Sequence, residues 1–521
     1  MVLRACFDVK RIAVIGAGPC GLAAAKYLVA QKAFSEIVVF EQAAEVGGVW
    51  NYSKTPSSTL HVPQTNPLCA PDPPVFPDKE GSAMFPSPMY DLLHTNIPRT
   101  IMGFKDLELS AGVAFPHRDE VQAYLVKYSQ DVRHLIKFST IVKDVRLRQG
   151  TGIDQWDVRT ESSTGGNPQM QTFDAVVVAS GHYSTTYMPR IPNIEDFHKT
   201  HPAVITHSKT YRSPSIYTGK KVIVVGNSAS GVDIAAQIQR VAGKVFLSVR
   251  EATASDSLAH IGAEETPPIS KFLVKEKGVQ FEDGRVEKDI DSVVFCTGYL
   301  FAFPFLESLA TPLLTDGRRV HGLYKDFLHI KHPTLVFPGL PIKVIPFPFS
   351  ESQAAIYARL WANALPLPSE KEMSDWEKSA EEQRGPAFHV YPKKGDVEYL
   401  REMHAWASKA ESGKEPPLWT DEQVWQREIY AQAKLEFEKT GRTAKTLAEL
   451  GFHYKAPSDA VEEAAQDTGS VGYNAPHNTL VACNEGRIKN EEICENVPNP
   501  VKIWAESELK KEKEIPPVPS P

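Results

Sequence analysis

The sequence predicts an α/β protein with two domains, each built on a parallel sheet, the second inserted into the first, and a mainly helical C-terminal extension. Three observations support this fold class. A strand, a glycine turn, a helix and a second strand follow one another over residues 11–41, and the same order restarts at residue 220. Each unit is followed later by a buried strand that ends in small residues, at 174–181 and 291–298, which indicates a duplicated architecture.

The first unit carries the motif Gly16-x-Gly18-x-x-Gly21 between its first strand and its helix, and Glu41 ends its second strand. Gly16 allows a tight turn, Gly18 lets the backbone approach a pyrophosphate, and Gly21 permits close packing of the helix. Glu41 can accept hydrogen bonds from ribose hydroxyls. The unit therefore predicts a dinucleotide-binding, Rossmann-like domain. Its elements are expected at 11–15, 22–29 and 37–40.

The second unit repeats this pattern as Gly226-Asn-Ser228-Ala-Ser-Gly231, with a serine in place of the middle glycine. Arg250 stands at the end of its second strand, where a guanidinium can pair with a 2′-phosphate, so the unit favours NADPH over NADH. Glu251 follows directly, and a lone arginine at a strand end can also be a solvated surface charge, so the preference stays open. Its elements are expected at 222–225, 232–241 and 245–249.

Outside the two glycine units, the sequence indicates loops and helices that would cover or support a site, and it shows no further catalytic motif. The proline-dense stretch 56–88 is long and irregular, and we place it over a site. An amphipathic helix is expected over 120–134, and capping-box patterns at 369–372 and 420–423 predict two helices in the extension. The end, 510–521, mixes charge and proline and predicts disorder. The expected domains are a first dinucleotide-binding segment over residues 1–190, a second dinucleotide-binding domain over 191–300, a return segment of the first domain over 301–365 and a C-terminal extension over 366–521.

Composition excludes several classes of protein. The 521 residues are 42% hydrophobic and 23% charged, which is ordinary for a globular chain, and the net charge of −7 argues against a general nucleic-acid partner. The sequence has no run of about 18 apolar residues and no signal-peptide pattern, so we expect no membrane anchor and a cytoplasmic location. The six cysteines form no Cys-x-x-Cys pair and no zinc spacing, so we expect reduced thiols and no metal site.

The two glycine motifs, together with Gly47-Gly48-Val49-Trp50 and Thr95-Asn96-Ile-Pro, are where the chain resembles the flavin-containing monooxygenases. The resemblance covers roughly residues 10–365 and implies FAD in the first domain and NADP in the second. It implies contacts to FAD from Gly16, Gly18, Pro19, Cys20, Gly21, Glu41, Val49 and Trp50. The remaining cofactor contacts are expected from Thr95, Asn96, Gly226, Ser228, Ser230, Gly231, Val232, Asp233 and Arg250.

The resemblance assigns the catalytic role to Asn96, whose amide would lie beside the flavin and NADP. Without the resemblance, Asn-Ile-Pro is an ordinary turn signal. The family motif Phe-x-Gly-x3-His-x3-(Phe or Tyr) is altered here, because Phe197 is followed by His198-Lys199, and His207 and Tyr211 come four residues late. His207 is expected to support a hinge or to be a hydrogen-bonded linker residue. The related Baeyer-Villiger enzymes carry Trp-Pro after a similar histidine, and Tyr211-Arg212 here leans toward heteroatom substrates.

The implied reaction is a monooxygenation. NADPH reduces FAD, oxygen adds at C4a, and the hydroperoxyflavin passes one oxygen atom to a soft sulfur or nitrogen nucleophile of a small molecule. Three alternatives stay open at this point: Baeyer-Villiger oxygenation, a flavin-linked NADPH reductase, and a redox-sensing protein that binds both nucleotides without turnover. A disulfide reductase would need a redox dithiol, and Val49-Trp50-Asn51 follows the glycine pair instead. The sequence leaves a homodimer open.

Overall fold

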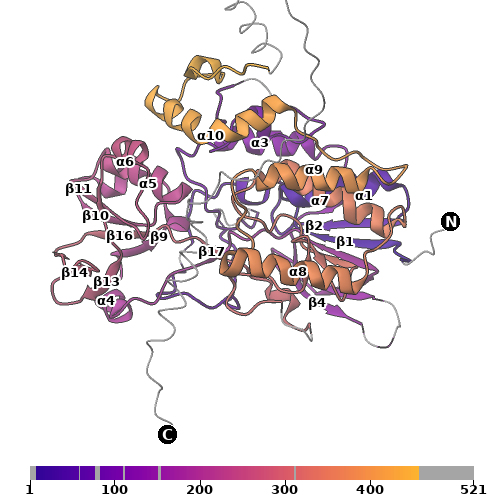
Figure 1. Cartoon of the computed structure of the whole chain (residues 1–521). Coiled ribbons are helices and arrows are strands. Elements are labelled where there is room, and N and C mark those ends of the chain that lie inside the picture. The colour runs from indigo at the N-terminus through magenta and orange to yellow at the C-terminus, as the bar shows by residue number, and fades with distance from the viewer. Residues whose placement is uncertain are drawn as a thin grey trace, which may run out of the picture.

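The computed structural model describes residues 7–57, 59–76, 82–109, 112–148, 150, 154–309 and 313–456. Two sheets lie side by side, with helices packed against them (Figure 1). The smaller sheet is parallel, and the larger one is parallel except for the antiparallel pairs of β18 (Leu323–Tyr324) with β19 (Leu328–His329) and of β19 with β20 (Leu335–Val336). This confirms the predicted fold class. The segment 510–521, expected to be disordered, lies outside the described residues.

The larger sheet has seven strands in the order β18-β19-β20-β7-β1-β2-β3. Its centre is the parallel pairing of β1 with β2 and β7. These Val-rich and Ile-rich strands are buried because helices α1 (Pro19–Gln31) and α7 (Pro346–Trp361) cover one face, and an antiparallel sheet over residues 140–173 covers the other. Three strands arrive from residues 323–336, after the smaller sheet is complete, so the second unit is inserted into the first. The strands are β1 (Arg11–Ile15), β2 (Glu36–Phe40), β3 (Ile136–Lys137), β7 (Ala175–Val178), β18 (Leu323–Tyr324), β19 (Leu328–His329) and β20 (Leu335–Val336).

The smaller parallel sheet has the order β12-β11-β10-β16-β9. Its strands are β9 (Ile205–His207), β10 (Lys221–Val225), β11 (Lys244–Ser248), β12 (Glu264–Thr266) and β16 (Ser292–Phe295). The helices α5 (Ala229–Gln239) and α6 (Ser255–Ile261) belong to this unit. The short antiparallel pair of β8 (Thr185–Thr186) with β17 (Tyr299–Leu300) joins the chain after β7 to the chain after β16. The two sheets are thus tied at the ends of their central strands.

Two further antiparallel sheets are peripheral. One contains β4 (Thr140–Leu147), β5 (Trp156–Ser162) and β6 (Gln169–Phe173), and the other contains β13 (Ile269–Leu273), β14 (Gly278–Phe281) and β15 (Val286–Glu287). Short 3-10 helices occupy Gly48–Trp50 (η1), Arg133–Leu135 (η2), Ser208–Thr210 (η3), Pro214–Tyr217 (η4), Pro304–Leu306 (η5), Gly385–Ala387 (η6) and Ala448–Leu450 (η7).

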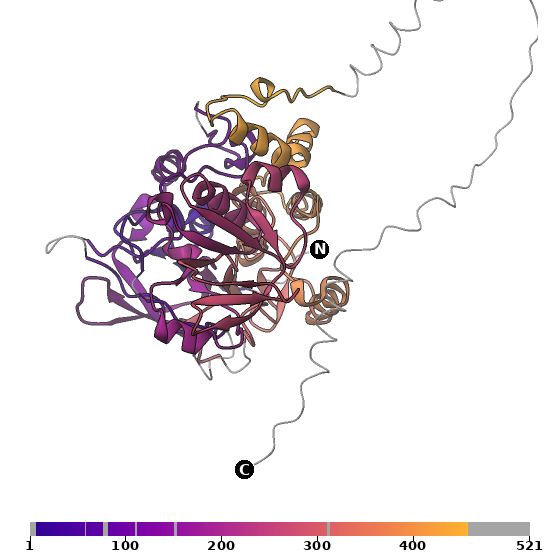
Figure 2. The ribbon, with the colours of Figure 1, turned by 90° about the vertical axis from the view of Figure 1, so that its left-hand side faces the viewer.

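The helices bury the larger sheet and extend beyond it. Helix α1 (Pro19–Gln31) packs against α7 (Pro346–Trp361), and α7 packs against α9. The other helices are α2 (Arg99–Met102), α3 (Arg118–Tyr128), α4 (Ile194–Thr200), α8 (Glu370–Arg384), α9 (Gly395–Ala407) and α10 (Asp421–Lys439). Both predicted capping boxes are confirmed, at Ser369 with Glu372 and at Thr420 with Gln423. Helix α10 lies above both sheets and contacts α2 and α6 (Figures 1 and 2).

Two expected elements are shorter than predicted. The helix over 120–134 ends at Tyr128, because the Ser129 hydroxyl donates to the Val126 carbonyl and the chain continues as turns and η2. The strand over 174–181 ends at Val178, because the chain leaves the sheet there to pass over the first glycine turn.

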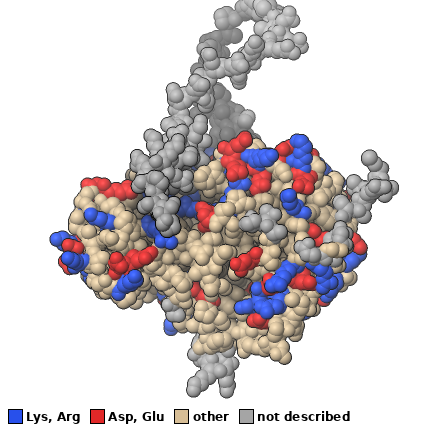
Figure 3. All heavy atoms as spheres, turned by 90° about the horizontal axis from the view of Figure 1, so that it is seen from below, with Lys and Arg blue, Asp and Glu red and all other residues tan. Residues whose placement is uncertain are grey.

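The charges on the outer surface are mixed. On the face seen in Figure 3, Lys and Arg side chains lie beside Asp and Glu side chains rather than in a separate basic field. Among the described helices, none is long and apolar enough to cross a bilayer. The cytoplasmic location and the absence of a nucleic-acid partner stay predictions.

Candidate active site

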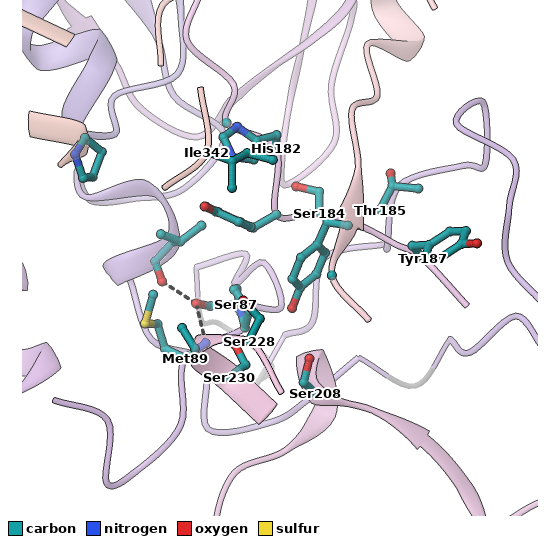
Figure 4. A pocket seen from close by; sticks show the side chains of 18 of the residues that line it. Ser87, Met89, His182, Ser184, Thr185, Tyr187, Ser208, Ser228, Ser230 and Ile342 are labelled. Atoms are coloured by element: carbon teal, nitrogen blue, oxygen red, sulfur yellow. Dashed lines mark hydrogen bonds between the residues drawn. The ribbon is translucent and has the colours of Figure 1, made fainter. Parts of the chain in front are cut away.

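A cavity of about 2110 Å³ lies between the two sheets and receives both glycine loops. The carboxyl ends of β1 and β7 meet it from one side and those of β10 and β16 from the other, which is where parallel sheets bind ligands. Figure 4 shows Ser87, His182 and Ile342 around the same space as Ser228 and Ser230 of the second unit. The predicted cofactor residues that line the cavity are Gly16, Gly18, Pro19, Cys20, Glu41, Val49, Trp50, Thr95, Asn96, Gly226, Ser228, Ser230, Val232, Asp233 and Arg250.

The two remaining predicted residues, Gly21 and Gly231, lie behind the loops. A Cβ on Gly21 would overlap the carbonyl oxygen of Gly16, and a Cβ on Gly231 would overlap that of Gly226. Each glycine therefore brings its helix against its own turn, the packing role that the motif predicts.

The first loop is shaped to receive an anion. Gly16 has φ +101°, and a Cβ there would lie 2.6 Å from the Ala179 carbonyl oxygen, so only glycine fits. Helix α1 begins beside Gly18 without a side-chain cap, which leaves its first N–H groups directed toward the cavity end of the helix. A pyrophosphate such as that of FAD fits this arrangement.

Glu41 faces the same loop from the end of β2. Its Oε2 accepts a hydrogen bond from the Ala17 N–H at 2.7 Å, and its Oε1 accepts one from the Ala43 N–H at 2.9 Å. Burial raises the pKa of this carboxyl group above its usual value. The two bonds fix the loop, and each oxygen keeps a second lone pair for a ribose hydroxyl.

The second loop repeats the backbone of the first. Gly226 also has φ +101°, and Ser228 has φ −77° and ψ −175°, beside −74° and −174° for Gly18. The serine is therefore unstrained, and its side chain is exposed toward the cavity. Arg250 is exposed at the end of β11, as the 2′-phosphate prediction requires. The carbonyl of Glu251 accepts from Asn227 Nδ2 at 2.9 Å.

The segment that carries Asn96 lines the same cavity as the two glycine loops. The Thr95 N–H donates to the Pro116 carbonyl at 2.9 Å, and the Thr95 hydroxyl donates to the Ile97 carbonyl at 2.8 Å. These two bonds use the polar groups of the buried Thr95 to hold the turn in place. The Asn96 side chain is exposed at the cavity. The contacts of both residues to cofactors stay predictions.

The proline-dense stretch covers the cavity, as predicted, over residues 82–88. The Ser87 hydroxyl donates to the Val49 carbonyl and accepts from the Met89 N–H at 3.3 Å (Figure 4). Because Val49 and Trp50 belong to η1 beside the first glycine loop, these bonds hold the cover against the loop.

His207 is a buried structural residue. Its Nδ1 accepts from the Lys209 N–H at 3.1 Å, so its Nε2 carries the proton and donates to the Gly298 carbonyl at 3.2 Å. Burial lowers the pKa of His207 to about 3, which keeps the ring neutral. The four extra residues of the altered motif form the turn between α4 and β9. This geometry supports the hydrogen-bonded role rather than acid-base chemistry.

Sequence reasoning missed two contributors to the cavity wall. His182 follows the end of β7; its Nε2 is buried without a protein partner, and burial lowers the pKa of the ring to about 4. The other contributor is one face of α10, whose helical spacing indicates that the helix has two faces but not which of them meets the cavity. The α10 residues that line the cavity are Arg427, Tyr430, Ala431, Lys434, Leu435 and Glu438.

The described residues show no metal centre: no group of three or more His, Cys, Asp or Glu among them is arranged to hold an ion. Cys20, Cys69 and Cys296 are free, and the other three cysteines lie outside the described residues.

Comparison with known proteins identifies relatives of both units. The family described as flavin-binding monooxygenase-like matches residues 78–268 and 266–418, and an NAD(P)-binding Rossmann-like domain matches residues 14–67. A thiol-specific monooxygenase of Saccharomyces cerevisiae is 32% identical over 434 residues, which cover 80% of this chain and 90% of the relative. Flavin-containing monooxygenase FMO GS-OX-like 4 of Arabidopsis thaliana is 34% identical over 376 residues, which cover 70% and 78%.

Two solved structures are similar to this chain over most of its length. S-allyl-L-cysteine S-oxygenase from Allium sativum matches with a TM-score of 0.69 and 25% identity, covering 88% of this chain and 99% of that one. Tmm from Pelagibacter sp. strain HTCC7211 matches with a TM-score of 0.63 and 25% identity, covering 82% and 91%.

The fold and the shared cavity define a flavoprotein with two dinucleotide-binding folds on one chain. The chain belongs to the flavin-containing monooxygenase family. It is an FAD-dependent monooxygenase with NADP as its second cofactor, and its substrates are a small molecule and oxygen.

The expectation that the resemblance ends near residue 365 is wrong, because the family match continues to residue 418. After residue 365, α8 packs against β18 and α9 against α7, and this part of the chain carries no glycine motif that would indicate the family.

Proposed function

We propose that this enzyme uses NADPH to transfer one oxygen atom from O2 to a sulfur atom of a small molecule. The observation that carries the proposal is the single cavity into which both glycine loops and Asn96 open. Bound FAD would supply the oxygen chemistry as a C4a-hydroperoxyflavin after reduction by NADPH. Sulfur is favoured over nitrogen because two similar proteins are described as a thiol-specific monooxygenase and an S-oxygenase.

The residues of this chain would bind, orient and exclude water. The N-terminus of α1 and Gly16 would hold the FAD pyrophosphate, and Glu41 its ribose. Ser228 and Ser230 would meet the NADPH phosphates. Arg250 would meet the 2′-phosphate. Such positioning needs no catalytic triad.

Asn96 would donate its amide hydrogen bond where the two cofactors meet. Its side chain is exposed on the cavity side, while Thr95 and the Pro116 carbonyl hold the turn from behind. The cover over 82–88 and the cavity face of α10 would keep water from the reacting atoms.

The test is a rapid-mixing experiment on the purified, FAD-loaded enzyme. The flavin is reduced anaerobically with NADPH and mixed with oxygenated buffer that contains a thiol, a thioether or a tertiary amine. We expect a flavin absorbance transient that decays faster with the sulfur compounds. One atom of ¹⁸O from ¹⁸O2 should appear in the sulfoxide formed from the thioether, whereas the sulfenic acid formed from the thiol condenses with a second thiol and releases its ¹⁸O as water. Decay accelerated by the amine alone would replace sulfur with nitrogen. Immediate reoxidation with hydrogen peroxide as the sole product would contradict the proposal.

A further inference from the structure

Helix α10 ends in a backbone motif that directs Arg442 toward both the segment before Asn96 and helix α5 of the second unit. The Gly441 N–H donates to the Glu438 carbonyl at 3.4 Å and the Arg442 N–H to the Phe437 carbonyl at 2.9 Å, the paired bonds of a Schellman ending. Both residues have positive φ, +81° for Gly441 and +64° for Arg442. A non-glycine residue keeps such a backbone only where its surroundings hold it there.

The Arg442 guanidinium contacts three segments that are far apart in the sequence. Its Nη1 donates to the Leu92 carbonyl at 2.8 Å, its Nη2 pairs with Asp233 Oδ1 at 3.4 Å, and its Nε donates to Glu438 Oε2 at 2.6 Å. The side chains are 13% exposed for Arg442, 16% for Asp233 and 9% for Glu438. Such shielding makes these charge contacts stronger than an ordinary surface ion pair.

Asp233 also binds groups from the segment before Asn96 and from its own helix. Its Oδ2 accepts hydrogen bonds from the Tyr90 hydroxyl and, at 3.1 Å, from Gln237 Nε2. Asp233 lies on α5, the helix that begins behind Ser228, while Tyr90 and Leu92 precede Asn96 in the chain. The carboxylate predicted to line the NADP site is thus held by protein groups at the junction of the two halves.

The end of α10 is anchored to the Asn96 side of this junction without Arg442. The Phe437 ring packs against Phe115 at 5.1 Å and against His94 at 5.6 Å between ring centroids. The Ala114 N–H donates to the Ala444 carbonyl at 2.8 Å. Loss of the guanidinium would therefore leave α10 in place and loosen α5, with the Tyr90 hydroxyl still bound to Asp233.

We propose that Arg442 is a positioning residue that holds the Asn96 segment against α5 and so sets the two nucleotide loops relative to each other. This inference rests on the proposed function for its catalytic consequence. Hydride and oxygen transfer depend on cofactor placement within a fraction of an ångström, so a looser junction wastes reduced flavin as hydrogen peroxide. Arg442 lies beyond residue 418, where the family match ends.

The test compares full-length, FAD-loaded Arg442→Ala and Arg442→Lys with Lys439→Ala as the matched control. Lys439 is on the same helix, is 45% exposed, pairs with Glu436 and lies outside the cavity wall. Two quantities are measured: hydrogen peroxide released per NADPH consumed, and amide hydrogen exchange with and without NADP⁺. We expect Arg442→Ala to release several-fold more peroxide and to exchange about tenfold faster over 90–97 and 229–239, with strand 11–15 unchanged. Arg442→Lys should be intermediate, and Lys439→Ala should match the wild type.

Exchange and coupling at wild-type levels in a folded Arg442→Ala variant would overturn the inference, as would exchange that rises equally in strand 11–15. Asp233→Asn weakens the same contact from the α5 side, and it replaces Arg442→Ala if that variant does not fold. Because Asp233 also lines the cavity, this variant is judged by its hydrogen exchange without NADP⁺ alone. The exchange result does not depend on oxygenation. A wild-type enzyme that never oxygenates a substrate would therefore refute the proposed function and leave the test of Arg442 intact.

Discussion

The two glycine loops share a backbone and differ in what surrounds it. Gly16 and Gly226 have the same φ of +101°, and Gly18 and Ser228 differ by only a few degrees. The strand that follows ends in a buried carboxylate in the first unit and in an exposed guanidinium in the second, Glu41 and Arg250. The loop conformation is thus common to both units, whereas the choice of nucleotide lies in the side chains around it.

The helices behind the loops differ as well. Helix α1 packs against the long, buried α7, which carries Glu351 in its interior, whereas α5 contacts the short elements α6, η3 and η4. The first unit is therefore integrated into the main core and the second is backed by less structure. We expect changes in the first loop to cost stability and changes in the second to cost mainly NADPH affinity.

The largest effect is expected from Gly16→Ala. A Cβ at φ +101° would meet the Ala179 carbonyl at 2.6 Å, so the variant should lose about 4 kcal/mol of unfolding free energy and its bound FAD. Thermal unfolding and flavin absorbance after purification measure both losses. The control is Gly165→Ala, which has φ +93° but nothing within 4 Å, and should lose only about 1 kcal/mol. Equal losses in the two variants would show that the collision contributes nothing.

The next effect is the pH dependence of stability that Glu351 adds to the first unit. Burial raises the pKa of Glu351 from 4.5 to about 7, so this carboxyl group contributes stability that is lost as pH rises through this interval. The buried His182 and His207, whose pKa values are lowered, change stability in the opposite direction in both proteins, so the expected effect is the difference between the wild type and Glu351→Gln. The loss should be about 3 kcal/mol and complete above pH 7, and Glu351→Gln should remove it. Urea unfolding at several pH values measures the difference. Parallel pH curves for the two proteins would refute the assignment.

Arg250→Ala should affect the second unit alone. Loss of a phosphate-binding guanidinium should raise the KM for NADPH about thirtyfold and leave the KM for NADH and the FAD content unchanged. Arg240→Ala is the control, because this exposed arginine of the same unit does not line the cavity. Equal changes with both nucleotides would place the 2′-phosphate elsewhere.

Asn96→Ala tests the segment between the loops. Without the amide, we expect about tenfold more hydrogen peroxide per NADPH consumed, with KM values for NADPH near those of the wild type. Asn96→Gln keeps the amide group and serves as the comparison. Full coupling of NADPH use to oxygenation in Asn96→Ala would remove the catalytic role of this residue.

The smallest effect is expected from Ser228→Gly, which makes the second loop resemble the first. Because φ is −77° at this position, no strain is relieved, and the loss of one hydroxyl contact should change the KM for NADPH about threefold. Steady-state kinetics at fixed substrate measure it. A change as large as that of Arg250→Ala would mean that the serine, not the arginine, dominates phosphate binding.

Local patterns were sufficient to predict much of the fold. Apolar periodicity predicted both βαβ units, and the structure contains them. A Ser or Thr followed three residues later by Glu or Gln predicted both capping boxes, which the structure also contains. The helix after residue 118 was predicted too long, because a single serine hydroxyl at Ser129 competes for a helix carbonyl. The cavity face of α10 was not predicted, since amphipathic spacing shows that a helix has two faces but not what each of them meets.

By itself, the sequence determined that two nucleotide-binding units exist, because glycine spacing, a flanking acid or arginine and buried strands are local requirements of that fold. Only the tertiary structure decided that the units share one cavity, that Asp233 is held by Tyr90 and Arg442, and that α10 contributes to the wall. Residues 233 and 442 meet because the packing of whole domains brings them together. Sequence periodicity describes single elements and contains no information on such distant contacts.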